Sequence, residues 1–344
     1  MARKTYSKRK GKKLQPAVMN LSFTANSGSG IVGGATNYID LSWAASIVNR
    51  RFYRQGINWS VAGFSVTTNG NTAPGTVTIC KAPTTWVTYN AWVKSKAMWD
   101  KMNLQVIEAN DHDITAKYHD FKVNLNSGMA VAGVQTDIQV PLDGQLLLPT
   151  DCSYSLPFTG NAGSGASEWS YSTIQIPTDG GSAPPVEFGL HIVGPDAATK
   201  GLITGYADSR SRPINSGEPN TGANGGWMTS LFDLADNLDE IRLDLRSDND
   251  VPPYHVGDDD SAAEFYPGGE RQLPGTEVVG YASFGVSVGA TGSVTNQRSI
   301  KGGMFPCGLV EINSNLTGPA FYDIIVHLVP GHHRGYLCEP MEDV

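Results

Sequence analysis

Apolar and polar residues alternate along much of this chain with the two-residue period of a half-buried β-strand. The clearest segments are Phe121-Val123-Leu125, Ile138-Val140-Leu142, Val186-Phe188-Leu190-Ile192, Ala282-Phe284-Val286-Val288 and Tyr322-Ile324-Val326-Leu328. Residues 169–176 and 304–312 are two further candidate strands. One apolar and one wet face per strand is typical of antiparallel sheets packed as a sandwich. In the third segment, this pattern places Glu187, Gly189 and His191 on the wet face.

Two shorter segments come earlier in the chain. The alternation Ile57-Trp59-Val61 continues as Phe64-Val66 in the other phase, which predicts a β-bulge at Ala62-Gly63. Val77 and Ile79 mark the next strand. We therefore predict an all-β fold, an eight-stranded antiparallel sandwich with short helices. Connections of very unequal length favour a jelly roll over an immunoglobulin-type sandwich.

Helical spacing is found in two places before residue 110. Leu41, Ala45, Val48 and Phe52 share one face, with Asp40 as a suitable N-cap and Gly56 as a suitable stop. A second helix is expected over residues 89–102, after Thr88 as its cap. Its tryptophans, Trp92 and Trp99, are seven residues apart on one face. We interpret them as packing anchors.

The longest connection, residues 194–277, does not have the pattern of a core strand. It is rich in Gly, Asn and Pro and holds one amphipathic stretch. That stretch is Leu231, Leu234, Leu238, Ile241 and Leu245, preceded by Ser230 and Asp233 in the arrangement of a capping box. We expect a surface insertion between core strands of one domain, which spans residues 17–344.

Charge divides the chain into two unequal parts. Within the first thirteen residues seven are basic and none is acidic; these seven are Arg3, Lys4, Lys8, Arg9, Lys10, Lys12 and Lys13. The rest of the chain carries 18 Lys and Arg against 33 Asp and Glu, because the whole has 25 and 33. We predict that residues 1–16 form a disordered basic arm that binds a polyanion and displaces counterions from its phosphates.

Composition excludes several classes of protein. No stretch has the roughly 18 apolar residues of a membrane span, and the basic start lacks the apolar core of a signal peptide, so we expect neither membrane binding nor secretion. The four cysteines, Cys80, Cys152, Cys307 and Cys338, form no C-x-x-C pair. In a reducing compartment we expect free and mostly buried thiols, with disulfides or metal ligation as the alternatives.

No catalytic signature occurs: H-E-x-x-H, G-x-S-x-G and the phosphate-binding glycine loop are all missing. We predict no enzyme activity and no cofactor. Residues 233–264 hold eleven carboxylates without the spacing of an EF-hand, so an acidic surface is favoured over a calcium site. His332 and His333, next to Arg334, are interpreted as surface residues, with phosphate or subunit contact as the alternative.

A second basic group, Arg50, Arg51 and Arg54, lies at the end of the first expected helix. The helix dipole alone accounts for cations there. Alternatively, the group continues the cationic path of the arm, and Tyr53 beside it, like Tyr6 in the arm, would stack on a base.

Two segments carry a resemblance beyond the general pattern. They are Asn49-Arg50-Arg51-Phe52-Tyr53-Arg54-Gln55-Gly56, and Thr85-Trp86-Val87-Thr88-Tyr89-Asn90-Ala91-Trp92-Val93-Lys94 continuing to Met98-Trp99-Asp100-Lys101-Met102. With the basic start and the strand series, the chain resembles the capsid proteins of small circular Rep-encoding single-stranded DNA (CRESS DNA) viruses. The resemblance implies an icosahedral shell of one repeated jelly-roll subunit, with the basic arm inside on the genome.

The leading hypothesis is therefore a viral coat protein, located in the virion, that assembles with copies of itself and packages single-stranded nucleic acid without reading sequence. DNA is the favoured cargo and RNA the alternative; no receptor is assigned. The candidate nucleic-acid-binding residues are the seven arm cations, then Arg50, Arg51 and Arg54. The arm also fits a nuclear localisation signal, which would place the protein in the host nucleus during assembly.

Two other classes stay open. A carbohydrate-binding or carbohydrate-active β-sandwich would use Trp59, Trp86, Trp169 and Trp227 to line a sugar groove. A nucleoplasmin-type nucleic-acid-binding protein would need long acidic tracts.

Overall fold

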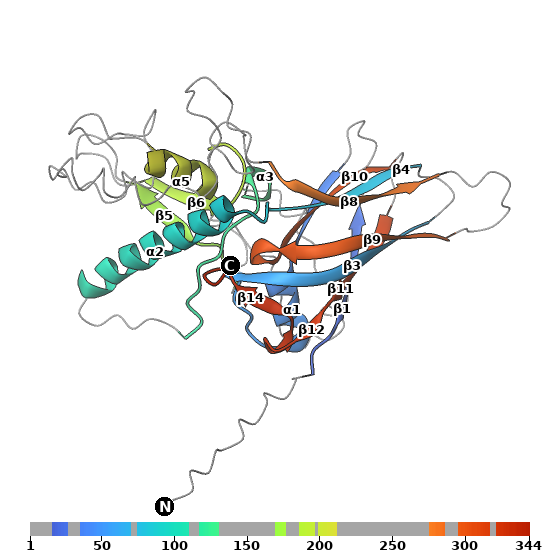
Figure 1. The fold of residues 1–344 in the computed structure, drawn as a ribbon, viewed down its shortest axis with the longest axis horizontal. Coiled ribbons are helices and arrows are strands. Elements are labelled where there is room, and N and C mark those ends of the chain that lie inside the picture. The colour runs from blue at the N-terminus through green and yellow to red at the C-terminus, as the bar shows by residue number, and fades with distance from the viewer. Residues whose placement is uncertain are drawn as a thin grey trace, which may run out of the picture.

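Two antiparallel sheets enclose the main apolar core of the molecule (Figure 1). The computed structural model describes residues 16–26, 35–69, 74–109, 117–130, 169–176, 186–196, 199–211, 275–285, 295–316 and 321–344. The first sheet contains β1 (Asn20–Asn26), β11 (Phe321–Leu328), β3 (Ile57–Asn69), β9 (Thr295–Phe305) and β14 (Cys338–Pro340). The second contains β2 (Ala35–Asp40), β10 (Leu309–Leu316), β4 (Gly75–Lys81) and β8 (Glu277–Phe284), in that order. The predicted β-rich, antiparallel architecture is confirmed.

The strands of the two sheets are paired in nested order. β1 pairs with β11, β2 with β10, β3 with β9 and β4 with β8, all antiparallel. Each strand of the first half of the chain therefore lies beside its mirror partner from the second half. Two further pairings, β11 with β3 and β10 with β4, join these antiparallel pairs into the two sheets.

The predicted alternation of β11 is confirmed. The four apolar residues of this alternation, Tyr322, Ile324, Val326 and Leu328, are all buried in the main core, while Asp323 between the first two is exposed. Ala282 and Phe284 of β8 are likewise buried and Ser283 exposed; Val286 and Val288 lie outside the described residues. Burial of one face only is what fixes the register of these strands.

The bulge predicted in β3 is also confirmed. Val61 pairs with Leu328 and Gly63 with His327, which leaves Ala62 without a partner on β11. The extra residue explains why Trp59 and Val61 before it, and Phe64 and Val66 after it, all reach the core despite their change of phase. The strand predicted around Val77 and Ile79 is β4.

The prediction of a single strand over residues 304–312 is wrong. The chain leaves β9 at Phe305, passes through the 3₁₀ turn η2 (Pro306–Gly308) and enters the other sheet as β10. Cys307 and Gly308 have positive φ angles of 56° and 68°. The apolar residues on both sides of this corner concealed it in the sequence, because both sheets place them in buried positions.

Helix α1 (Leu41–Asn49) begins as predicted and ends early. The Asp40 carboxylate accepts from the backbone N–H groups of Ser42 and Trp43, which confirms the N-cap. The helix ends at Asn49 because Arg50 turns into the left-handed region, φ 53°. Gly56 is therefore not its stop, and Phe52 lies beyond it.

Helix α2 (Trp86–Ala109) is longer than predicted at both ends. The side-chain oxygen of Thr85, and not Thr88, accepts at the first turn, from the Thr88 N–H at 3.4 Å. Trp92 and Trp99 are buried in a second apolar cluster, which confirms their role as packing anchors.

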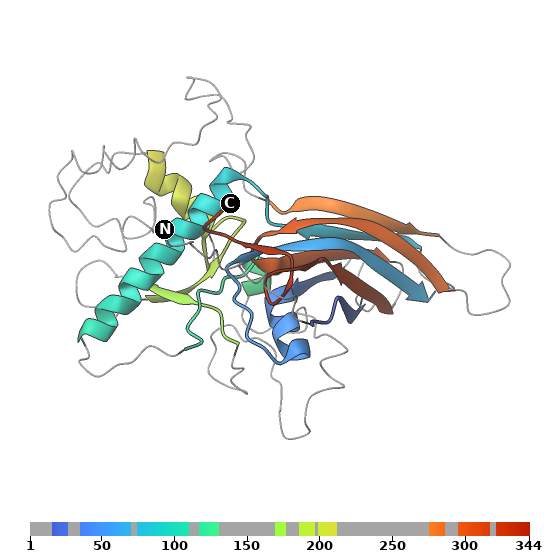
Figure 2. The ribbon, with the colours of Figure 1, turned by 60° about the horizontal axis from the view of Figure 1, so that its bottom comes forward.

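A third, smaller sheet follows α3 (Ser127–Ala130) and consists of β5 (Thr173–Ile176), β6 (Val186–His191) and β7 (Thr199–Gly201), with α5 (Leu202–Ser211) after it. β6 and β7 are parallel. These elements and α2 lie to one side of the two main sheets (Figures 1 and 2). They all fall between β4 and β8 in the chain. The predicted strands 169–176 and 186–192 therefore belong to this layer and not to the sandwich.

Two predictions in this layer are wrong. Residues 121–125, predicted as a strand, are buried beside β6 but form only an isolated bridge, between Asn124 and His191. His191, predicted on a wet face, is fully buried; its Nδ1 lies 2.8 Å from the Thr199 hydroxyl on β7. Burial lowers the pKa of this imidazole.

Several predicted features lie outside the described residues: the arm up to residue 15, the strand 138–142, the helix 231–245 and the acidic segment 233–264. Within the part that is described, no helix is long and apolar enough to cross a membrane.

Candidate nucleic-acid interface

The basic arm joins the folded body beside the end of α1. The Val18 N–H donates to the Asn49 side-chain oxygen at 3.0 Å, and the Tyr336 hydroxyl donates to the Val18 carbonyl at 2.6 Å. The Asn49 amide in turn donates to the Tyr336 oxygen at 2.7 Å. This triangle fixes residue 18 next to Asn49, which directly precedes Arg50. The seven arm cations themselves lie outside the described residues.

The three predicted arginines of the body follow at once. Arg50 and Arg51 are exposed, and their backbone N–H groups donate to the Ile47 and Ser46 carbonyls that the end of α1 leaves open. Arg54 is exposed over 57% of its side chain. Its Nη1 donates to the His119 carbonyl at 2.9 Å and to the Asp120 carboxylate at 3.3 Å. The structure thus places Arg50 and Arg51 next to the point where the arm joins the body, and Arg54 against residues 119–120.

A fourth cation joins this group from the C-terminal part of the chain. Arg334 lies in the turn between β12 (Pro330–Gly331) and β13 (Gly335–Tyr336), with φ 52°. Its guanidinium donates to the Phe52 carbonyl, and its own carbonyl accepts from the Tyr53 hydroxyl at 3.1 Å. Figure 1 shows α1 and β12 together at one end of the molecule. Arg334 and Arg50 are far apart in the sequence, so the sequence alone could not predict that Arg334 lies beside the arginines of residues 50–54.

The structure contradicts the alternative in which Tyr53 stacks on a base. Its ring is fully buried, between Trp59 at 5.9 Å and Tyr336 at 5.5 Å between ring centroids. Burial raises the pKa of its hydroxyl. Tyr53 packs residues 50–54, here called the arginine segment, onto the core and is not accessible to a base.

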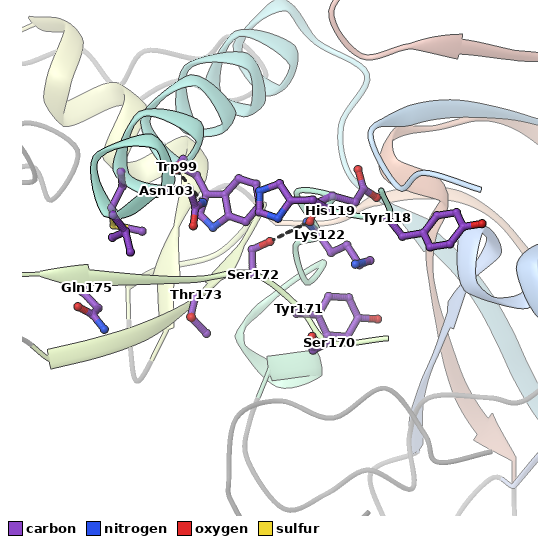
Figure 3. Close-up of a pocket in the computed structure, with 13 residues that line it drawn as sticks. Trp99, Asn103, Tyr118, His119, Lys122, Ser170, Tyr171, Ser172, Thr173 and Gln175 are labelled. Carbon is purple, nitrogen blue, oxygen red and sulfur yellow. Dashed lines mark hydrogen bonds between the residues drawn. The ribbon is translucent and has the colours of Figure 1, made fainter. Parts of the chain in front are cut away.

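A hollow of about 510 Å³ opens beside His119 and Asp120, the two residues that Arg54 contacts (Figure 3). Three segments line it: α2, residues 118–122 and residues 170–175. Reciprocal hydrogen bonds tie the last two together, from the Lys122 N–H to the Ser172 hydroxyl at 3.0 Å and from the Ser172 N–H to the Lys122 carbonyl at 2.8 Å. The wall therefore depends on contacts between residues far apart in sequence.

Aromatic rings and charges are both present in this hollow. Trp99 and His119 stack with centroids 4.5 Å apart and an interplanar angle of 14°. The Lys122 ammonium lies 4.9 Å from the Trp169 ring centroid. Burial lowers the pKa of Lys122, against the attraction of Asp120, and raises the pKa of Asp120, against the attraction of Lys122 and Arg54. No spacing signal in the sequence could have predicted this assembly.

One buried carboxylate supports the wall from behind. Besides capping α1, Asp40 accepts from Gln55 Nε2 at 3.1 Å, the Trp169 indole N–H at 3.3 Å and the Tyr171 hydroxyl at 3.2 Å. Desolvation raises its pKa to about 6, although these donors oppose the shift. Asp40 thus joins the corner of the sandwich to the segment that carries Tyr171.

Some residues of the other candidate sites lie outside the described residues. Of the tryptophans considered for a sugar groove, Trp59 and Trp169 are buried and Trp86 is exposed, while Trp227 lies outside the described residues. Cys80, Cys307 and Cys338 are free thiols, and Cys152 lies outside that part of the chain. Among the residues with described positions, no cluster of His, Cys, Asp and Glu has the geometry of a metal site.

No family model, curated protein or solved structure matches the chain.

Proposed function

We propose that this chain is a viral capsid protein, that eight strands of its two main sheets, β1 to β4 and β8 to β11, form a jelly roll, and that it packages single-stranded nucleic acid through its basic arm. The observation that carries the proposal is the nested pairing of first with last strand, second with second-last, and so on inward. A jelly roll is such a nested set of antiparallel pairs folded into two facing sheets, and it is a common architecture of viral capsids.

The position of the arm supports the second part. The arm ends where Val18 of the body bonds with Asn49, next to Arg50 and Arg51, and the Arg334 guanidinium bonds with the Phe52 carbonyl close by. Cations on a tail and on the surface where the tail begins would contact one continuous stretch of phosphate backbone. Such contacts neutralise and position a strand without reading its sequence.

Assembly multiplies this charge. In a closed icosahedral shell of identical subunits, every copy contributes its arm to the interior, so a modest charge per chain becomes a large one per particle. The chain then has a structural role, is found in the virion, and needs no cofactor. The same arm would act as a nuclear localisation signal before assembly.

The decisive experiment separates assembly from packaging. Recombinant full-length protein and a variant lacking residues 2–13 are compared by negative-stain electron microscopy and by nuclease-protected nucleic acid per particle. We expect both to form particles and the truncated protein to protect much less nucleic acid. The salt dependence of single-strand affinity should also fall, by roughly 0.7 in log–log slope per lost phosphate contact.

A body variant tests the second cationic group. Replacing Arg50, Arg51 and Arg54 by Gln should reduce packaging further, because phosphate contacts beside the arm are lost. The matched control replaces Arg298 and Lys301, exposed cations of β9, by Gln. Equal packaging by the truncated and full-length proteins, or a protein that forms no particle in either form, would overturn the proposal.

A further inference from the structure

The hollow beside α2 is continuous with the arginine segment. Arg54 donates to the backbone carbonyl of His119 and to the carboxylate of Asp120, and both residues line the hollow. Two positions earlier, the Phe52 ring lies 5.1 Å from the ring of Tyr118, another lining residue. A strand whose phosphates follow Arg50, Arg51 and Arg54 therefore arrives at the entrance of this hollow.

The lining suits a flat aromatic group that carries a negative charge. Trp99 and His119 already form a stack, and the Tyr118 ring is 58% exposed, with the Lys117 ammonium 5.4 Å from its centroid. Aromatic side chains flanked by cations are what proteins use to hold bases of single strands. The volume of about 510 Å³ lies within the range of small-ligand pockets.

The polar groups of the hollow fit the same ligand. Among the described residues that line it, Asp120 is the one carboxylate, and it forms an ion pair with Arg54. On the opposite wall, Ser170 and Gln175 are exposed, and Thr173 is half-buried, so hydroxyl and amide groups are available to the edge of a base (Figure 3).

We propose that this hollow holds one nucleobase of the single strand that the arm and arginines bind by its phosphates. The proposal rests on the proposed packaging function and adds to it a base-binding position in each subunit. Stacking accepts every base, since each has a π-face, so the site orders the strand without making packaging sequence-specific. The shared chemistry, a base with its phosphate, also occurs in free nucleotides, and the test must distinguish the two sources.

The first measurement needs no variant. Full-length protein is irradiated with a single-stranded oligonucleotide that contains 4-thiothymidine, and the cross-linked peptides are identified by mass spectrometry. We expect cross-links at residues 117–122, with the Tyr118–His119 pair as the main position. Cross-links confined to the arm and to residues 50–54 would overturn the base-binding site while leaving the packaging function intact.

The second measurement separates base from phosphate. Tyr118→Ala should weaken binding of an oligothymidine roughly 5- to 150-fold, the range seen when a stacking aromatic side chain is removed. It should not change binding of an abasic strand of equal length. Tyr281→Ala is the matched control, because Tyr281 is an exposed tyrosine on β8, 70% accessible and outside the lining of the hollow. An equal loss for both strands would refute base recognition by Tyr118.

A competition experiment identifies the source of the base. Thymidine monophosphate, at the base concentration of the oligonucleotide, should leave the cross-link at residues 117–122 nearly unchanged, because it lacks the phosphates held by the arm. If the monophosphate competes as well as the oligonucleotide, the hollow is a free-nucleotide site and the proposal fails. Loss of oligonucleotide binding on removal of residues 2–13, without loss in Tyr118→Ala, would support the packaging function and reject this site.

Discussion

The hydroxyl of Tyr336 lies 2.6 Å from the carbonyl oxygen of Val18, although the two residues are 318 positions apart. The hydroxyl oxygen of Tyr336 also accepts from the Asn49 amide, so one buried phenol holds the first residues of the body against the end of α1. The base of the arm is thereby anchored to the core, where the Tyr336 ring packs against Trp59.

Removing this hydroxyl should cost measurable stability. Tyr336→Phe keeps the ring contacts but removes the hydrogen bonds to the Val18 carbonyl and from the Asn49 amide, which keeps its bond to the Ala45 carbonyl, so we expect the free energy of unfolding to fall by about 1–2 kcal/mol. Urea unfolding followed by tryptophan fluorescence measures it. Tyr281→Phe, at an exposed hydroxyl, should change stability by less than about 0.5 kcal/mol. Equal midpoints for the two variants would contradict the anchor.

The buried Asp40 carboxyl should make stability depend on pH. Its pKa is about 6 in the folded protein against 3.8 for an unperturbed carboxyl, because burial disfavours the charge. Between these values the folded state holds a proton that the unfolded state has released. The Asp40 contribution to the free energy of unfolding therefore falls as pH rises from about 4 to above 6, by up to roughly 3 kcal/mol.

Asp40→Asn tests this sign. The variant has no titrating group at this position, so its unfolding free energy should lose that part of the decline between pH 4 and 7. The quantity to compare is the difference between wild type and variant at each pH, because other carboxyls titrate in both proteins. A difference that stays constant across the range would show that Asp40 is not the titrating group.

The corner between β9 and β10 should tolerate no side chain at Gly308. Its φ is 68°, and an added Cβ would lie 2.7 Å from Cδ1 of the Trp59 ring. Gly308→Ala combines a strained backbone with an overpacked core, so we expect a loss of about 2–4 kcal/mol in thermal or urea unfolding. At Gly285 an added Cβ meets nothing within 4 Å, which makes Gly285→Ala the control. Similar stability of both variants would contradict the packing of this corner.

The thiols should be slow to react in the native protein. Burial raises the pKa of Cys338 to about 12, raises that of Cys80, and raises that of Cys307 well above its ordinary value. The thiolate is the reactive form, so these three should react with a thiol reagent such as DTNB only after unfolding in guanidinium. Their assignment by mass spectrometry after native labelling is the measurement. Rapid labelling of Cys307, which is fully buried, would be the contrary result.

Local patterns predicted the strands that face the main core and failed where burial is two-sided. The alternation in β11, the phase change at Ala62 and the Asp40 cap are each encoded within a few residues, and each is confirmed. His191 shows the opposite case: a histidine next to apolar positions indicates a wet face, yet Thr199 supplies a hydrogen-bond partner that permits burial. The early end of α1 depends on the backbone conformation of Arg50, which residue type does not reveal.

The same distinction applies to the candidate site: local sequence indicates some of its residues, and only contacts between distant segments indicate the others. A run of cations such as Arg50 and Arg51 is visible in any sequence, whereas Arg334 joins them only through the pairing of distant strands. The hollow needs three segments at once, and the spacing of Trp99, His119 and Ser172 along the chain carries no trace of their contact. The helical spacing of Trp99 indicates packing alone, because a ring that also lines a cavity has the same spacing.

The nested pairing has a consequence for the ribosome. Asn20 of β1 bonds with His327 of β11, 307 residues later, so the first sheet cannot close until the chain has emerged through β11. Contacts of such separation make folding slow and leave strand edges exposed meanwhile. Translation speed and chaperone supply should therefore affect the yield of native subunits.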